Sequence, residues 1–267
     1  MCKILEVSRS SYYKRKSKGK SKRKLENEKI ILMIKEIYTE SKERYGSPRI
    51  TEELRRRGIS CNKKRIARLM RKEGIAAKIF RKYRLTTQSD HKRVISDNIL
   101  DREFNRGRVN EVWTSDITYI RTDEGWLYLA AVMDLYSRRI LGWHLDRRLE
   151  SGLVEKALQN ALYGRKISRG IIFHSDQGVQ YASESFRGLL KTNGFIQSMS
   201  RRGNCYDNAV TESFFHTLKT ELINRTKYKT REEARRSIFE YIEIFYNRKR
   251  LHSSIGYCSP VEFEAMT

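Results

Sequence analysis

The sequence predicts an α/β protein with a mixed five-stranded sheet and flanking helices, preceded by a small all-helical helix-turn-helix domain. Three features of the 267-residue chain support this fold class. Two capped helical segments lie close together before residue 77, three β-rich segments follow one another between residues 112 and 145, and helices and strands alternate after that. Such a succession is typical of a mixed sheet with helices packed on it. The length suits about two domains.

The first helical part begins after a cationic run at residues 14–24, which has no apolar period and is expected to be a flexible basic arm. Apolar residues then recur at helical spacing over residues 25–38. A helix is predicted at Pro48–Arg57 with Ser47 as its cap, and another at Lys63–Glu73 with Asn62 as its cap. Two capped helices joined by a tight turn indicate a helix-turn-helix, with an ordinary helical hairpin as the alternative.

The second of these helices combines an apolar stripe with a basic face. A helix of this kind can enter a DNA groove and contact phosphates. The predicted DNA-contacting residues on it are Lys63, Lys64, Arg65, Arg68, Arg71 and Lys72.

The sheet is predicted from short β-rich segments separated by turn residues. The expected strands are Val112–Ile120, Trp126–Leu135, Arg139–Leu145, Ile171–His174 and Phe195–Met199, and the expected helices are Gly152–Tyr163, Ser185–Thr192, Asp207–Ile223 and Arg231–Asn247. The first three strands form an antiparallel meander, because only turn residues separate them.

The charge of the chain is strongly positive and unevenly distributed. It contains 56 Lys and Arg against 32 Asp and Glu, a formal net charge of +24. Residues 1–108 hold 33 of the basic and 13 of the acidic residues, so most of the excess lies there. A basic region of this kind indicates nucleic-acid binding, although a merely solvated surface has the same composition. Hydrophobic residues make up 39%, enough for a folded protein.

Several functional classes are excluded by what the sequence lacks. The longest apolar run, Trp126–Met133, is far too short to cross a bilayer, and the first residues do not resemble a signal peptide. The four cysteines form no C-x-x-C pair, which argues against a disulfide framework or a cysteine zinc site and favours the reducing cytoplasm. No P-loop, dinucleotide-binding, zinc-protease or serine-hydrolase motif occurs.

Three carboxylates lie where local propensity alone does not place them. Asp116 falls inside a predicted strand, where a buried charge must be paired or bound to a metal. Asp176 follows a predicted strand, at the end of the strand where α/β sheets bind ligands. Glu212 lies on a predicted helix, with His216 and Lys219 aligned beside it. Taken singly, each acid has an ordinary alternative as a turn former or a solvated side chain.

Taken together, three carboxylates without nearby histidine or cysteine pairs favour Mg²⁺ or Mn²⁺. Two such ions about 3.5–4 Å apart can support cleavage and joining of phosphodiesters, and Lys219 would then contact the DNA backbone. Asp134 is interpreted as structural. His174 and His216 have a substrate-contacting role and a packing role open to them, and the three tryptophans are expected in the core.

Three motifs and their spacing carry a resemblance to a known family. They are Trp113–Ile120, His174–Tyr181, and Asp207–Phe215 followed by Lys219, with 35 residues between Asp176 and Glu212. These segments resemble the integrase-type core of bacterial insertion-sequence transposases, and the chain as a whole is similar to the OrfB-type proteins of the IS-three family. Further matches occur at Tyr45–Ile50, Val132–Arg139 and Tyr246–Pro260.

The resemblance implies an RNase H-like fold with Asp116, Asp176 and Glu212 as a metal-binding acidic triad. It also implies cleavage and strand transfer at the terminal inverted repeats of the element, with Mg²⁺ or Mn²⁺ as cofactor, and we expect two ions. The implied partners are DNA, further copies of the chain on DNA, and a protein from an upstream reading frame, made separately or as a fusion. The expected site of action is the bacterial nucleoid. A catalytically inactive DNA-binding regulator and a nuclease that only hydrolyses are the alternatives.

The expected domain organisation follows from these assignments. We expect a basic arm at residues 1–24, a helix-turn-helix-like domain at 25–77, a linker at 78–108, an integrase-type core at 109–225, and a C-terminal helix and tail packing on the core at 226–267.

Overall fold

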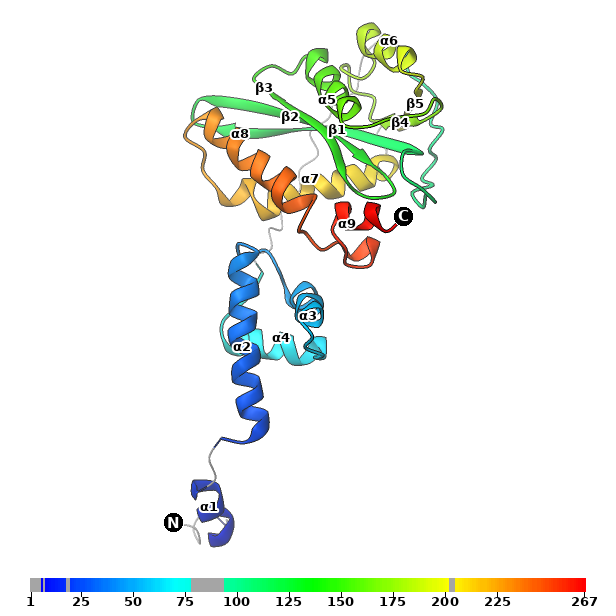
Figure 1. Ribbon diagram of the computed structural model, residues 1–267. Helices are drawn as coiled ribbons and strands as arrows, with labels where there is room; N and C mark the ends of the chain where they lie inside the picture. The colour runs from blue at the N-terminus through cyan, green and yellow to red at the C-terminus, as the bar shows by residue number, and fades with distance from the viewer. Residues whose placement is uncertain (1–5, 7, 18–19, 78–93, 202–204) are drawn as a thin grey trace. The chain divides into compact units, whose positions relative to one another are not determined.

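A computed structural model describes residue 6 and residues 8–17, 20–77, 94–201 and 205–267. The chain divides into two compact units, Met1–Lys78 and Ile79–Thr267, which are drawn in Figure 1. Residues 78–93 of the predicted linker lie outside the described residues. The linker's second half differs from the prediction, because Leu100 is fully buried and the carbonyl of Asp97 accepts a hydrogen bond from Met199 N. The core unit therefore begins before residue 109.

The first unit contains four helices among its described residues: α1 (Arg9–Ser17), α2 (Lys22–Glu40), α3 (Ser47–Arg56) and α4 (Lys63–Lys72). The cationic run is more helical than predicted. It overlaps α1, and α2 begins at Lys22 because the Ser21 side chain caps it by accepting from Lys24 N. Lysine and arginine are good helix formers, and a missing apolar period does not prevent a capped helix from starting among them.

The helix-turn-helix prediction holds in its elements and differs at one cap. Asn62 caps α4 by accepting a hydrogen bond from Lys64 N at 2.8 Å, as predicted. The predicted cap Ser47 is wrong, because α3 starts one residue earlier, with Gly46 in the extended capping position. The unit's core forms where the isoleucines of α2 meet the apolar faces of α3 and α4. Its buried aliphatic residues are Ile30, Ile31, Ile34, Ile37, Ile50, Leu54, Ile66, Leu69 and Met70.

The second unit is built on a five-stranded mixed sheet, as predicted. Its strands are β1 (Val112–Thr122), β2 (Gly125–Asp134), β3 (Ile140–Asp146), β4 (Ile172–Ser175) and β5 (Ile196–Met199), in the order β3-β2-β1-β4-β5. The first three strands are antiparallel, while β4 runs parallel to β1 and β5 parallel to β4. The first three strands are therefore the predicted meander.

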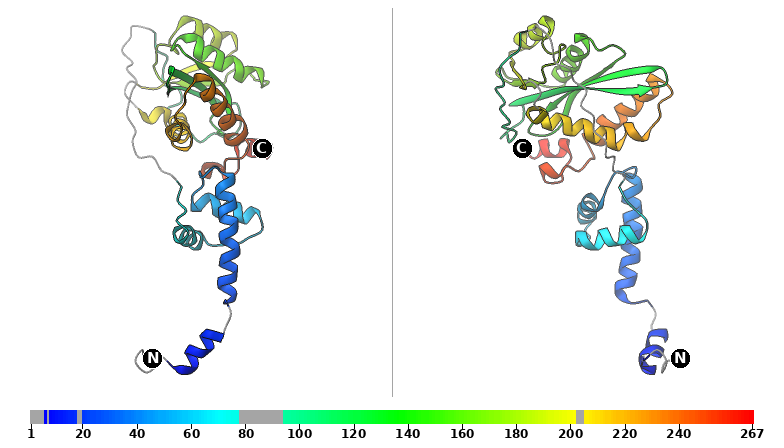
Figure 2. Two further views of the ribbon diagram at one scale, coloured as in Figure 1. Left: turned by 90° about the vertical axis from the view of Figure 1, so that its left-hand side faces the viewer. Right: turned by 180° about the vertical axis from the view of Figure 1, so that it is seen from behind.

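Helices cover both faces of this sheet. Helices α5 (Ser151–Tyr163) and α6 (Glu184–Thr192) lie on one side, and α7 (Ala209–Glu221) and α8 (Arg231–Phe239) lie on the other (Figures 1 and 2). The strand alternation sets this arrangement: Trp113 belongs to the core beneath α5 and α6, whereas the next residue, Thr114, accepts a hydrogen bond from Thr211 of α7. No helix among the described residues has the length and apolarity needed to traverse a bilayer.

The last forty residues depart from the predicted single helix. The α-helical geometry of α8 ends at Phe239, and a π-helix continues over Glu240–Tyr246. The tail packs on the core unit: Asn247 caps the edge of β3 through two hydrogen bonds to the backbone of Ile140, each 3.0 Å long. A short helix, α9 (Pro260–Ala265), follows, with a capping box formed by Ser259 and Glu262. The predicted helix Asp207–Ile223 likewise begins as a 3₁₀-helix, Cys205–Asn208, before α7.

Candidate active site

The first acid lies on a part of β1 that β4 does not cover. Strand β4 pairs with β1 over Val112–Thr114, and further along β1 Thr122 bridges to Tyr228. Asp116 lies between these two contacts and is half-buried. Its Oδ1 accepts a hydrogen bond from the backbone N–H of Ile117 at 2.7 Å. The carboxylate therefore satisfies a backbone donor that has no strand partner there.

The second acid follows β4 directly. Asp176 is held in its turn by a 3.0 Å hydrogen bond from Gly178 N to its Oδ1. A Cβ atom at residue 178 would lie 3.0 Å from this same oxygen, so the turn is tight enough to favour glycine. Because β4 is parallel to β1, its carboxyl end lies beside the stretch of β1 that carries Asp116.

The third acid is carried by the first turn of α7. The hydrogen bond of 2.8 Å from Thr211 Oγ1 to Thr114 Oγ1 fixes this turn against β1. Glu212 follows Thr211 and is half-buried. Two strands and one helix thus place the three acids at one edge.

The electrostatics show that the structure brings the three carboxylates within range of one another. Burial raises the pKa of Asp116 well above its usual value, and the charges of Asp176 and Glu212 add to the rise. Burial and the charge of Asp176 also raise the pKa of Glu212. Carboxylates that disfavour each other's ionisation attract a cation. Among the residues that the structure describes, however, no group of three or more His, Cys, Asp and Glu side chains is already gathered closely enough to hold a metal ion.

A tyrosine that the sequence analysis missed lies beside the acids. Tyr181 is buried and shares a 2.8 Å hydrogen bond with Ser115, the neighbour of Asp116. Burial raises the pKa of its phenol well above the usual value, and the charges of Asp116 and Asp176 contribute. Tyr181 therefore ties the turn after β4 to β1. Tyr181 ends the motif His174–Tyr181, but nothing in the sequence indicated its contact with Ser115, since a buried tyrosine after a turn has the pattern of ordinary core.

Lys219 reaches the same edge from α7. Its Nζ lies 5.1 Å from the centre of the Tyr119 ring, within range of a cation–π contact. Burial lowers the Lys219 pKa, and the charge of Asp116 opposes this. Lys219 is thus close to Asp116 and Tyr119. Its contact with DNA stays a prediction.

The histidines separate into different environments. His174 is fully buried, and its Nδ1 shares a 2.9 Å hydrogen bond with Ser198 Oγ. Burial lowers its pKa to about 4, so the ring is neutral at pH 7, and of the two roles left open for it packing is favoured. His216 is exposed on α7.

Asp134 has a structural environment, in agreement with its interpretation. It is fully buried and accepts hydrogen bonds from the backbone N–H groups of Asn110 and Ser137, each 2.8 Å long. The expectation for the tryptophans is wrong in one case. Trp113 is fully buried, but Trp126 is 48% exposed.

The basic face of α4 is largely as predicted. The exposed residues on it are Lys63, Lys64, Arg68, Arg71 and Lys72. Arg65 differs, because its Nε and Nη2 donate to Asn27 at 3.0 and 2.8 Å and its Nη1 pairs with Glu26 at 3.0 Å. Arg65 therefore binds α4 to α2. This correction removes it from the residues available to DNA phosphates.

A second missed group holds the start of α7 in place. Asp207 is fully buried, and its carboxylate accepts hydrogen bonds from Arg201, Arg102 and Asn98. The side-chain hydrogen bond from Arg201 is the largest cause of a pKa well below the usual value, so the carboxylate stays ionised. The position of an aspartate just before a helix could have suggested a structural role. Its partners could not be predicted, because Arg102 is distant in the sequence and the spacing from Arg201 matches no known motif.

Comparison with known proteins decides the family. Residues 106–205 and 212–267 match two families that are both described as integrase core domains, and residues 24–83 match an HTH-like domain. The chain is 42% identical to the transposase InsF for insertion sequence IS3A of Escherichia coli K12, over 99% of this chain and 92% of that protein. The chain belongs to the IS3 family of insertion-sequence transposases. The integrase-like core and the helix-turn-helix part are thus confirmed.

The chain is also similar to other proteins. An uncharacterized 31 kDa protein of insertion element IS600 from Shigella sonnei is 42% identical, over 98% of this chain and 97% of that protein. Among solved structures, the catalytic core domain of BIV integrase aligns with 59% of this chain and 95% of its own, at 17% identity and a TM-score of 0.44. The InsF relative and the integrase-core family show that this IS3-family transposase acts in DNA transposition, and the inactive regulator and the hydrolysis-only nuclease are not favoured.

Proposed function

We propose that this transposase cuts and joins DNA strands at the terminal inverted repeats of its element through Asp116, Asp176 and Glu212. The observation that carries the proposal is the mutual electrostatic effect of these three carboxylates at the uncovered edge of β1. A fold gains no stability from burying acids that repel one another. Such a cluster is typical of a site that takes up cations to act.

The donor set fits divalent cations of the hard, oxygen-preferring kind. All three groups are carboxylates, which suits Mg²⁺ or Mn²⁺, and membership of the integrase-core family implies use of a divalent metal. Asp116, Asp176 and Glu212 would hold one or two ions. When bound, such ions activate water or a 3′-hydroxyl for in-line attack on a phosphodiester and stabilise the leaving oxygen.

The protein's own groups orient this chemistry. The N–H groups of Ile117 and Gly178 each donate to one oxygen of Asp116 and Asp176, which fixes the orientation of the two carboxylates. Lys219 supplies a positive charge next to Asp116, where a scissile phosphate would lie. The exposed basic residues of α4 would bind the DNA backbone at the inverted repeats and contribute affinity that decreases with salt.

We further propose that the transposase works as a homo-oligomer on DNA at the bacterial nucleoid, with a protein from an upstream reading frame as partner or fusion. The charge excess in residues 1–108 is consistent with DNA held by this part of the chain. Size-exclusion chromatography with light scattering, with and without the element ends, measures the stoichiometry.

The deciding experiment incubates the purified chain with Mg²⁺ and labelled element ends. Joined product supports the transposase, cleaved product alone supports the nuclease, and bound but unaltered DNA supports the regulator. Asp116→Asn should abolish joining and leave DNA affinity nearly unchanged, because it removes a cation ligand while keeping the side chain's size. Asp97→Asn, at an exposed aspartate of the same unit, is the matched control and should join normally. Full joining by Asp116→Asn contradicts the assigned role.

A further inference from the structure

The hairpin formed by β1 and β2 carries an aromatic and basic face. Cross-strand register pairs Tyr119 with Tyr128 and Arg121 with Trp126. Because residues two apart on a strand point to the same side, these four side chains share one face of the hairpin, which we call the hairpin face. Tyr119 and Trp126 also contact each other edge to face, with ring centres 5.5 Å apart.

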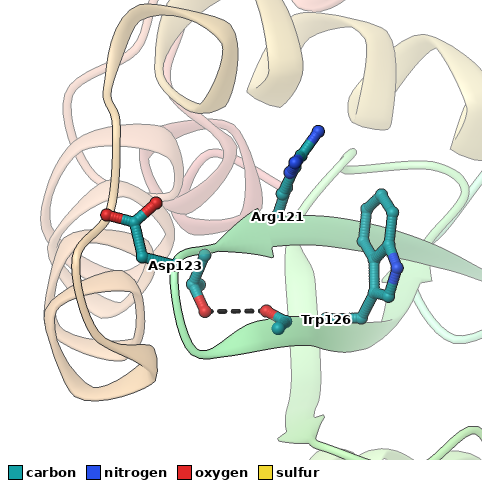
Figure 3. A pocket seen from close by; sticks show the side chains of 5 residues that line it. Arg121, Asp123 and Trp126 are labelled. Atoms are coloured by element: carbon teal, nitrogen blue, oxygen red, sulfur yellow. Dashed lines mark hydrogen bonds between the residues drawn. The ribbon is translucent and has the colours of Figure 1, made fainter.

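The hairpin face leaves a large aromatic side chain exposed to solvent, and no packing contact accounts for this exposure. Trp126 leaves 48% of its surface exposed, whereas Trp113 on the same sheet leaves none. The side chain of Arg121 is exposed and makes no hydrogen bond or ion pair with the residues that the structure describes. Figure 3 shows both side chains rising from neighbouring strands on the same side. A pocket of about 430 Å³ lies here, within the size range of small-ligand sites.

The hairpin is held rigidly enough to present such a site. Thr122 Oγ1 donates to the carbonyl of Gly125 at 2.7 Å, the bond drawn in Figure 3. Arg231 binds the hairpin from the start of α8, because its backbone N–H donates to Glu124 and its Nε donates to the carbonyl of Trp126. Asp123 also lines the pocket, but its carboxylate points away from Arg121 and Trp126 in Figure 3.

Direct side-chain contacts connect the hairpin face to the catalytic acids. Trp126 contacts Tyr119, and the Tyr119 ring receives Lys219, whose charge interacts with Asp116. Along β1, the five steps from Asp116 to Arg121 span about 17 Å at the usual rise of a strand. This length matches about five stacked nucleotides.

We propose that the hairpin face binds one unpaired nucleotide of the DNA strand that leads to the catalytic acids, with its base stacked on Trp126 and its phosphate paired with Arg121. The proposal rests on the function proposed above and adds a binding site to it. An exposed indole offers a stacking surface that accepts any base, and a guanidinium with no partner in the described part of the chain offers two donors to a phosphate. A duplex cannot present an unpaired base, so the site favours an opened or frayed end over an intact one.

The test measures DNA binding without catalysis, in the full chain carrying Asp116→Asn. Its probes are a blunt element end and the same end with a five-nucleotide unpaired tail that contains 2-aminopurine. We expect the tail to tighten binding about tenfold and the 2-aminopurine emission to be quenched by stacking. Trp126→Ala should remove both effects, and Trp126→Phe should keep most of them.

Two further variants make the result specific. Arg121→Gln should reduce the gain in affinity that the unpaired tail gives. It should also lower the salt dependence of binding to the tailed DNA by about 0.7 in slope, the value for one phosphate contact with a single strand. Phe239→Ala removes an aromatic side chain that is 52% exposed elsewhere on the core unit, and it should change nothing. The proposal would be overturned if the unpaired tail tightened binding equally in the chain with Asp116→Asn alone and in the chain that also carries Trp126→Ala. Because no strand is cut in this assay, that result would leave the proposed catalytic role intact, which the joining assay tests separately.

Discussion

A buried ion pair between the C-terminal tail and α7 allows a strong prediction. Arg250 Nη2 lies 2.8 Å from Glu221 Oε1, and the two side chains are only 5% and 10% exposed. Tyr241 donates a further hydrogen bond of 2.8 Å to Glu221 Oε2. Burial alone would lower the Arg250 pKa, but the neighbouring Glu221 carboxylate outweighs it and raises the pKa above its usual value. The Arg250 guanidinium is thus charged, and its burial depends on the Glu221 carboxylate.

Glu221→Gln removes the carboxylate and leaves the Arg250 guanidinium buried without a counter-ion. Breaking a buried pair from one side costs about 3–5 kcal/mol in free energy of unfolding. In a unit of 150–250 residues, each kcal/mol lowers Tm by about 2–4 °C, so we expect a fall of roughly 6–20 °C. The double variant Glu221→Leu with Arg250→Met leaves no unpaired charge and should recover most of the loss.

Urea unfolding followed by tryptophan fluorescence measures this loss in the right part of the chain, because all three tryptophans lie in the core unit. Glu232→Gln is the control. It breaks an exposed pair with Arg236 on α8, which is worth less than about 1 kcal/mol. A loss below 1 kcal/mol in Glu221→Gln, or a double variant as unstable as the single one, would refute the reasoning that the tail is bonded to α7 by a buried pair.

Three other predictions follow from single sites. Gly142→Ala would place its Cβ 2.3 Å from Ala161 N and 2.5 Å from Ala157 O. This substitution should lower the free energy of unfolding measured in urea by about 1–3 kcal/mol. Gly152→Ala is the control and should not lower it, because nothing lies within 4 Å of the added Cβ. Since burial, Asp176 and Glu212 all raise the Asp116 pKa, protons compete with the cation above the usual aspartate range. The joining activity should therefore decrease on acidification from neutral pH, and a higher Mg²⁺ concentration should move this decrease to lower pH. A pH profile that does not change with the Mg²⁺ concentration would contradict the prediction. Arg68→Ala should reduce the salt slope of DNA binding by about 0.9, while Arg65→Ala should instead lower the thermal stability of the first unit; the reverse pattern would show that the two roles are misassigned.

The sequence was most informative where local rules and tertiary packing agree. Strands β1, β2 and β3 are separated only by turns, so their antiparallel pairing follows from chain connectivity alone. The Asn62 cap was predicted because its side chain acts on the backbone two residues further on. The candidate acids could be selected because a carboxylate inside a strand, such as Asp116, conflicts with local preference.

The failures occurred where the outcome depends on a partner distant in sequence. Arg65 has the same spacing as its basic neighbours, and only the approach of Asn27 and Glu26 from α2 sets it apart. Trp126 has the composition of a core residue, but it lies near the end of a hairpin that α5 does not cover. Periodicity distinguishes a buried stripe from an exposed one and contains no information on which helix covers it.

Helix α7 shows how the fold accommodates charges that it would otherwise exclude. The charged forms of Glu212 and Lys219 are both disfavoured by burial, which raises the pKa of Glu212 and lowers the pKa of Lys219. Three contacts along the helix offset this: buried Asp207 with its arginines before the first turn, Thr211 on β1, and the Glu221–Arg250 pair at the last turn.

These anchors bear on the proposed catalytic role, because they hold the helix at both ends while Glu212 and Lys219 lie between them. These contacts oppose movement of the helix away from β1. On the function proposed above, the repulsion that raises the pKa of Asp116 and of Glu212 would favour the binding of a cation. Loosening either end should weaken cation binding before it affects DNA binding, since no residue of α4 takes part in these contacts.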